Sequence, residues 1–500
     1  MKKILFAIVI CFPILCNGQL HINLQGTTIK KISSNISENT PIELLYLRLD
    51  VNGNYFIAVR TSTTSELISY SDIDKISFTP ATLKDFWENH AFQYSTYNSL
   101  LKNGFQYKLR DELDEDAVEY GNRIKKDNLD FEDLYLESYI YSLINRIYPS
   151  QLDDRRPGAI NLTIIKNSTP NAFIFPNGSL FITTGLLSTI NTEEELIAVL
   201  AHEISHFVLD HHITNVNKAI QRQKNAEFWA SIATGIAAAV DIYGVIKGKY
   251  YLPGLLTMNT AILATSIVSA LNERMGLKYS KEQEIEADNC TIELLKFIKI
   301  NPNALSSVLN KILQYLTANG NYYALTEDGT YPALMDRLNK LGDPIPFLSV
   351  EYDRKISFVN SFNSILEFNN RHFISCISLA ERNIIAGIGT EDDYVILAMV
   401  NLFMYDTDSK NKEALDLISK AKTLNIYSSI NILKQESIAL IRLKMYKEAK
   451  DCLNKYKESL NQEKQNIGSI NNDNEWIATF SYINNELEWT AKMINKVNLL

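Results

Sequence analysis

The sequence between Glu194 and His212 contains the pattern that most constrains this chain, a His-Glu-x-x-His motif. Apolar residues recur there every three or four positions, which predicts an amphipathic helix. On such a helix, His202 and His206 lie one turn apart and project from the same face. Two neutral imidazoles in this arrangement can occupy adjacent corners of a tetrahedral zinc site. Glu203 lies beside them, where it can accept a proton from a metal-bound water.

Histidine is concentrated in this segment. The chain has 7 histidines, and four of them lie between positions 202 and 212. This concentration favours a metal site over a chance match to a short motif. His212 takes the place of the third histidine of metzincins, but Leu209 replaces their glycine. A continuous helix would carry His212 away from the metal, so we expect the third ligand elsewhere.

A second helix is predicted after Ser280, where carboxylates cluster. Glu284 and Asp288 share one face of this helix, while Glu286 points elsewhere. We expect Glu284 to complete a site of two histidines and one glutamate for one Zn²⁺, with the fourth position open to water. Asp288 would accept a hydrogen bond from a ligating histidine and fix its tautomer.

Four motifs follow one another along the middle of the chain. They are Asn-Ala-Phe-x-x-Pro-x-Gly at 171–178, Gly-Leu-Leu at 185–187, the His-Glu-x-x-His motif followed by His211, and Ser-Lys-x-x-Glu-x-x-Ala-Asp at 280–288. In these motifs the chain resembles the family of the HtpX heat-shock proteases, the CAAX prenyl endopeptidases, the mitochondrial Oma protease and the periplasmic BepA and LoiP proteases. Lys281 stands where the family has arginine. The resemblance covers the segment from Leu134 to Leu341.

The resemblance implies a zinc metalloendopeptidase in which Glu284 binds the metal. We expect Asp288 and His211 to contact the ligands rather than the metal. Periplasmic members of the family continue with His-Pro and an arginine, and the histidine of BepA-like proteins can approach the zinc and hold the enzyme in check. This chain has Tyr331 in place of that histidine and Arg337 at the position of the arginine.

Two roles are open for Tyr331. Its hydroxyl could hydrogen-bond the oxyanion of the tetrahedral intermediate, or the residue could be an ordinary packed loop tyrosine. Arg337 is expected to orient the active-site carboxylates or the substrate.

A hairpin is predicted directly before the helix of the histidines, with its turn at Pro176-Asn177-Gly178. Its open edge would lie beside the metal and could align an extended substrate as an added strand. The residues expected to contact substrate are Asn171, Ala172, Phe173 and Phe175.

The first 18 residues are expected to be a signal peptide, with a positive start, an apolar run and cleavage after Gly18. A lipoprotein modified at Cys16 is the alternative. Either form would be exported, and we expect the periplasm of a Gram-negative bacterium, with or without membrane association. The remaining cysteines, Cys290, Cys376 and Cys452, are too far apart and odd in number for a disulfide framework, so we expect small buried residues.

Three domains are predicted after the signal peptide. Residues 19–82 favour strands and form a small β-rich module. Residues 83–345 carry the metallopeptidase motifs, and residues 346–500 are helical throughout. Similar segments begin at Lys412 and Lys447, at a spacing close to the tetratricopeptide period, which suggests helical repeats that bind envelope protein partners.

Two apolar stretches between 228 and 271 are near the length of a membrane helix, but Asp241 interrupts the first. We expect a helical hairpin packed on the catalytic domain, and membrane contact through this segment stays open. A membrane-embedded protease of the HtpX kind is the corresponding alternative.

The predicted fold class is α+β, with a mostly helical zincin-like catalytic domain and a small β-hairpin edge between the β-rich module and the helical repeats. A net charge of −9 without a basic cluster gives no reason to expect nucleic-acid binding. The predicted function is a zinc-dependent endopeptidase of the bacterial envelope that acts on unfolded or misassembled proteins. The alternative is a latent protease that works as a chaperone or assembly factor through its repeats.

Overall fold

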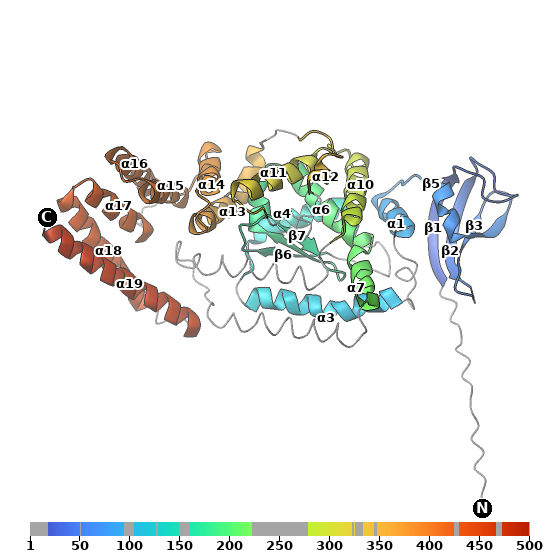
Figure 1. The fold of residues 1–500 in the computed structure, drawn as a ribbon, viewed down its shortest axis with the longest axis horizontal. Helices are drawn as coiled ribbons and strands as arrows, with labels where there is room; N and C mark the ends of the chain where they lie inside the picture. The colour runs from blue at the N-terminus through green and yellow to red at the C-terminus, as the bar shows by residue number, and fades with distance from the viewer. Residues whose placement is uncertain are drawn as a thin grey trace, which may run out of the picture.

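The computed structural model describes residues 19–50, 52–94, 105–126, 129–149, 160–222, 279–322, 325, 334–344, 348–424, 430–466 and 473–499. Along the molecule, a β-rich module is followed by a mixed central part and then by a helical region (Figure 1). This arrangement confirms the predicted α+β class. The expected signal peptide, the apolar stretches at 228–271 and Tyr331 lie outside the described residues.

The N-terminal module is one antiparallel sheet in the order β4-β3-β2-β1-β5. Its strands are β1 (Gln19–Thr28), β2 (Pro41–Leu49), β3 (Tyr55–Arg60), β4 (Ser65–Ser69) and β5 (Ile76–Phe78). Gly53 has a positive φ of 85° in the turn between β2 and β3, where the Asp50 carboxylate accepts the backbone N–H groups of Asn52 and Asn54. One face of this sheet is buried around Leu24, Leu44 and Ile57.

Helix α1 (Leu83–Tyr94) joins this module to the central part because it contributes to both cores. Phe92 packs into the core of the module, and Tyr70 donates a hydrogen bond to its carbonyl oxygen. Trp87 is fully buried in the central core and donates from Nε1 to the carbonyl oxygen of Ile147 at 2.6 Å.

The central part has three layers. Its sheet has the order β6-β8-β7, with β6 parallel and β7 antiparallel to β8. Because side chains alternate along a strand, Phe173 and Phe181 pack under α3 on one face, while Ile174 and Ile182 face the core around α6 on the other. The elements are α3 (Phe105–Lys126), α4 (Leu134–Ile147), β6 (Asn161–Ile165), β7 (Ala172–Ile174), β8 (Ser179–Thr183), α5 (Thr184–Thr189), α6 (Glu193–Val208), α7 (His211–Arg222), α10 (Lys281–Phe297), α11 (Ala304–Ala318) and α12 (Leu334–Leu338).

Helix α6 is the central element of this part, and every residue from Glu195 to Val208 is buried. Its first turn is fixed by side chains: Thr192 accepts the N–H of Glu195, and the Glu195 carboxylate accepts the N–H of Asn191 at 2.6 Å. Lys311 of α11 neutralises the same carboxylate, with Nζ–O distances of 2.5 and 2.7 Å.

The predicted continuous helix to His212 is wrong. Helix α6 ends at Val208, Asp210 adopts a left-handed φ of 58°, and α7 begins at His211. Aspartate tolerates this conformation better than most residues do, which allows the chain to turn here without glycine. The break brings His211 back toward the histidines of α6.

The C-terminal region is a succession of helices in which each packs on its neighbour (Figure 1). Small residues such as Ala414, Ala439 and Ala449 are fully buried where these helices meet. A tetratricopeptide-like repeat remains our prediction for this region. The helices are α13 (Val350–Asn369), α14 (Phe373–Ile385), α15 (Glu391–Met404), α16 (Asp408–Leu424), α17 (Ile430–Arg442), α18 (Tyr446–Asn466) and α19 (Asp473–Asn498).

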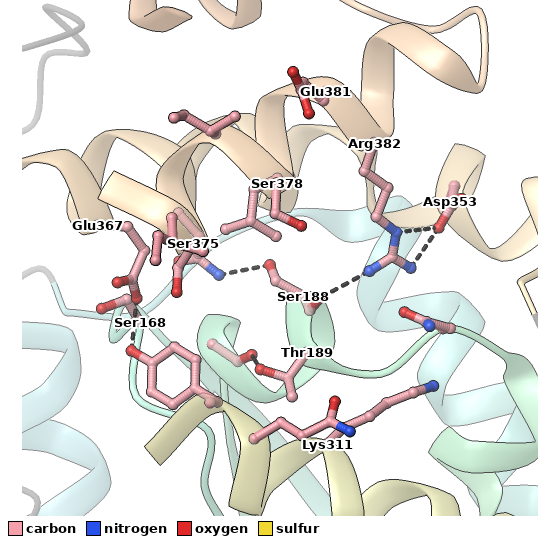
Figure 2. A pocket seen from close by; sticks show the side chains of 18 of the residues that line it. Ser168, Ser188, Thr189, Lys311, Asp353, Glu367, Ser375, Ser378, Glu381 and Arg382 are labelled. Carbon is pink, nitrogen blue, oxygen red and sulfur yellow. Dashed lines mark hydrogen bonds and ion pairs between the residues drawn. The ribbon is translucent and has the colours of Figure 1, made fainter. Parts of the chain in front are cut away.

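Charged groups join the helical region to the central part around a cavity of about 840 Å³ (Figure 2). Arg382 of α14 donates to Asp353 at 2.6 Å and to the carbonyl oxygens of Ser188 and Ile190 at 2.8 and 3.0 Å. Nearby, the Ser349 N–H donates to the carbonyl oxygen of Asn191, at 3.2 Å, in the loop before α6.

The cysteines Cys290, Cys376 and Cys452 are buried and free, as expected. Of the helices within the described ranges, none combines the length and the hydropathy needed to cross a membrane.

Candidate metal centre

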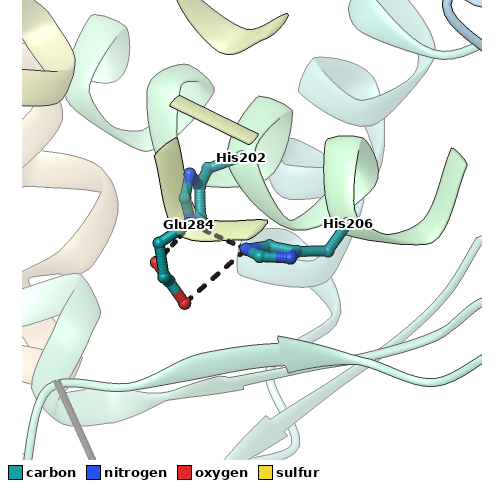
Figure 3. Close-up of side chains that lie close together, drawn as sticks. All are labelled: His202, His206 and Glu284. Carbon is teal, nitrogen blue, oxygen red and sulfur yellow. Dashed lines mark hydrogen bonds and ion pairs between the residues drawn. The ribbon is translucent and has the colours of Figure 1, made fainter. Parts of the chain in front are cut away.

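His202, His206 and Glu284 point toward one another from α6 and α10 (Figure 3). Each offers a ligand atom, and these atoms all lie within 4.8 Å of one another. The two Nε2 atoms are 3.1 Å apart, close to the separation of about 3.3 Å that two nitrogens have on one tetrahedral zinc ion. Two imidazoles and one carboxylate are also the donor set of a catalytic zinc site, so the residues present fit this metal.

The second nitrogen of His202 faces a carboxylate. His202 Nδ1 lies 3.1 Å from Asp288 Oδ1, which favours the tautomer that leaves Nε2 free to bind a metal. Arg337 of α12 donates two hydrogen bonds of 2.8 Å to Asp288 and forms an ion pair with Glu284 through Nη1. Burial alone would raise the pKa of Asp288, but Arg337 and His202 lower it to about 2, so this carboxyl is ionised at neutral pH.

The second nitrogen of His206 faces another histidine. His206 Nδ1 and His211 Nδ1 are 2.8 Å apart, and His211 Nε2 lies 3.1 Å from Glu286 Oε2. If His206 binds a metal through Nε2, its Nδ1 carries the proton and donates to His211. His211 must then carry its own proton on Nε2 and donate it to Glu286. The three side chains thus form one chain of hydrogen bonds that leads from the metal position to the protein surface.

Glu203 lies inside the same buried site. Its Oε2 atom has no hydrogen-bond partner among the described residues. Burial, supported by the carboxylate of Glu284, raises the pKa of Glu203 to about 8, against the opposing charges of His202 and Arg337. A carboxyl whose pKa lies near neutrality can both take up and release a proton, and a cation beside it would lower that pKa.

Tyr279 lies immediately before the N-cap of α10 and covers one ligand. Its ring stacks on the imidazole of His206, with centroids 3.7 Å apart and planes inclined by 12°. Ser280 and Gln283 form a capping box at this point, which fixes where the chain enters α10. Sequence spacing alone did not indicate this tyrosine.

The open strand edge that was expected to bind substrate is present in the sheet. Strand β7 ends the sheet order β6-β8-β7, and Asn171 and Ala172 are half-buried there. Phe173 and Phe175, however, are buried against α3, on the face of the sheet opposite to α6. Their side chains therefore do not point to the metal position, so any contact of this strand with substrate would come from its backbone.

The contacts of two further residues did not follow from the sequence. Glu286 was expected to point away from the site, and the break between α6 and α7 instead gives it His211 as a partner. Lys281 forms an ion pair with Asp336, which links α10 to α12 at the surface.

The comparisons with known proteins agree with this geometry. The sequence model of peptidase family M48 matches residues 135–345. This part of the chain is therefore a peptidase M48 domain, and the family resemblance found in the motifs is confirmed. The β-rich module and the helical region lie outside the matched range.

Several curated proteins are similar over this domain. Mitochondrial metalloendopeptidase OMA1 of Schizosaccharomyces pombe is 25% identical over 212 residues, which cover 42% of this chain and 54% of that protein. Protease HtpX of Legionella pneumophila strain Corby is 31% identical over 184 residues, 34% of this chain and 56% of that protein. The beta-barrel assembly-enhancing protease of Yersinia pestis is 27% identical over 180 residues, 36% of this chain and 33% of that protein. The chain thus spans about half of the first two relatives and a third of the last.

Proposed function

We propose that this chain is a zinc-dependent endopeptidase. The observation that carries the proposal is the buried convergence of His202, His206 and Glu284 within an M48 domain, with the carboxyl group of Glu203 beside them. One Zn²⁺ bound by these three ligands would supply a Lewis acid and a water of lowered pKa.

Glu203 is the proton carrier of the reaction. Its carboxylate takes a proton from the attacking water and returns it to the nitrogen of the leaving amine when the peptide bond breaks. Asp288 and His211 hold the two ligand imidazoles in the tautomer that exposes Nε2. Arg337 keeps the carboxylates of Glu284 and Asp288 ionised and in place.

The substrates we propose are unfolded or misassembled proteins of the bacterial envelope. The expected signal peptide and the similarity to a beta-barrel assembly-enhancing protease support an exported, periplasmic enzyme of this kind. The backbone edge at Asn171 and Ala172 would align an extended substrate as an added strand. Helices α13 to α19 would bind envelope protein partners. The ligand set and the proton carrier of the M48 domain favour an active endopeptidase over the chaperone alternative.

Metal content and casein cleavage test this function on the chain that begins at Gln19. Glu203→Gln should retain one zinc per chain and lose cleavage, because only the proton carrier changes. Glu194→Gln is the matched control, since Glu194 is exposed on the same helix, and should cleave as the wild type does. Absence of zinc would refute the ligand assignment, and zinc without cleavage in the wild type would refute the endopeptidase.

A further inference from the structure

Tyr279 is placed as a wall of the metal centre. Its ring lies flat on the imidazole of His206, and the residue is only 8% exposed. It also meets His211 edge-on, at 6.1 Å between ring centroids and 61° between planes. The aromatic ring therefore has a clear packing role, which a phenylalanine would fulfil equally well. The hydroxyl group requires a separate explanation.

The hydroxyl group of Tyr279 is buried and has no hydrogen-bond partner among the residues that the structure describes. Removing a hydroxyl from water without a new partner destabilises a fold, so such groups are rare unless they serve another purpose. The other unpartnered oxygen in this centre is Oε2 of Glu203. Two buried oxygen atoms around one metal position thus lack hydrogen-bond partners within the described residues.

Geometry places this hydroxyl in the metal centre, because the ring that carries it is stacked on the ligand His206. A tyrosine hydroxyl carries its proton at neutral pH, so the group acts there as a neutral hydrogen-bond donor or acceptor. A proton-bearing donor next to Glu203 and the metal ligands is what a developing negative charge on a substrate oxygen requires.

We propose that the hydroxyl of Tyr279 donates a hydrogen bond to the carbonyl oxygen of the scissile peptide bond as that oxygen becomes negatively charged. This inference rests on the proposed endopeptidase function and adds a residue to it. Water oxygen forms a bond to the carbonyl carbon, the carbonyl π electrons move to the oxygen, and Glu203 takes the water proton. Tyr279 keeps its own proton throughout and stabilises the oxyanion until the C–N bond breaks.

The test is Tyr279→Phe, which removes one oxygen and keeps the stacked ring. We expect kcat to fall about a hundredfold, as on loss of one oxyanion donor, with little change in KM. A phosphinic peptide, which mimics the tetrahedral intermediate, should lose affinity by a comparable factor in calorimetry. Zinc content should stay at one per chain. In EDTA, the unfolding temperature should equal or exceed that of the wild type, because the hydroxyl has no partner to lose among the residues that the structure describes.

Tyr352→Phe is the matched control, since the buried Tyr352 hydroxyl donates to the carbonyl oxygen of Leu187 at 3.0 Å. It should lower the unfolding temperature and leave kcat/KM unchanged. If the wild type is active and Tyr279→Phe has the same kcat and the same affinity for the phosphinic peptide, the role of the hydroxyl is overturned. The proposed endopeptidase function would stand in that case. A loss of stability in Tyr279→Phe as large as in the control would also overturn the proposed role of the hydroxyl, because the hydroxyl would then be structural. A wild type that neither cleaves nor binds the phosphinic peptide would refute this inference together with the proposed function.

Discussion

His206 and His211 face each other through their Nδ1 atoms at 2.8 Å, although they belong to different helices. Only one of the two atoms can carry the proton of this hydrogen bond. Glu286, at 3.1 Å from His211 Nε2, favours the state in which His211 accepts from His206. The carboxylate of Glu286 thereby orients the metal ligand His206 through His211.

Substitution of His211 should weaken metal binding. His211→Ala removes the acceptor of His206 Nδ1–H, and we expect zinc affinity to fall about ten- to a hundredfold. Competition with a chromophoric chelator measures this loss directly. The same substitution at His21, which is exposed in the β-rich module, is the control. Equal affinities in His211→Ala and the wild type would show that His206 needs no support from this side.

Arg337 should matter most when no metal is bound. It is buried between Glu284 and Asp288, so Arg337→Met leaves two buried carboxylates without their counter-charge. We expect the free energy of unfolding in EDTA to fall by about 3–5 kcal/mol. Urea denaturation measures the change, and saturation with zinc should recover part of it because the metal also neutralises Glu284. An unchanged urea midpoint in EDTA would contradict this role.

The ion pair of His90 and Glu293 should make the free energy of unfolding decrease as the pH becomes alkaline. It joins α1 to α10 at 3.0 Å, and His90 Nδ1 also contacts the carbonyl oxygen of Phe86 at 2.8 Å. Burial opposes the charge, but hydrogen bonds with Cys290 and Glu293 raise the pKa of His90 to about 10. The pKa of His90 in the folded protein lies above its value of about 6.5 in the unfolded chain. The stabilisation by the protonated imidazole is therefore complete below pH ~6.5 and is lost as the pH rises to about 10. The stability difference between the wild type and His90→Gln should therefore shrink from pH 6 to pH 10 in chemical denaturation, whereas a pH-independent difference would exclude this origin.

Arg382 should hold the helical region on the M48 domain. Its guanidinium group neutralises Asp353 and satisfies the carbonyl oxygens of Ser188 and Ile190. Arg382→Met leaves these groups unpaired, and we expect a loss of about 3 kcal/mol in the free energy of unfolding. Arg354→Met is the control, because Arg354 is exposed on the same helix as Asp353. Equal unfolding curves for the two variants would show that the contact between the helical region and the M48 domain does not depend on Arg382.

The parts of the centre that follow from local geometry could be predicted from the sequence. Helical spacing alone places His202 and His206 on one face, and the family motif supplies Glu284. Glu286 could not be found in this way, because its partner depends on the left-handed turn at Asp210, where no glycine marks the end of α6. The role of Tyr279 depends on a ring contact between α6 and the start of α10, which residue spacing does not encode.

Gly185 shows how the structure explains a motif that the sequence could only match. A Cβ atom at this position would lie 2.1 Å from the carbonyl oxygen of Ser168. No L side chain fits there without moving the backbone of the preceding loop. Steric exclusion of a side chain therefore explains the glycine of the Gly-Leu-Leu motif. The motif itself does not reveal that Ser168 is the residue in contact with it.

Asn191 uses both of its backbone polar groups to connect two parts of the molecule. Its carbonyl oxygen accepts from Ser349 at the start of the helical region, and its N–H donates to Glu195 in the first turn of α6. A displacement of α13 would reach the base of the histidine helix through Asn191, and it would reach the end of the preceding helix α5 through Tyr352. Any shift of the helical region relative to the central part would therefore also strain the first turn of the helix that carries His202 and His206.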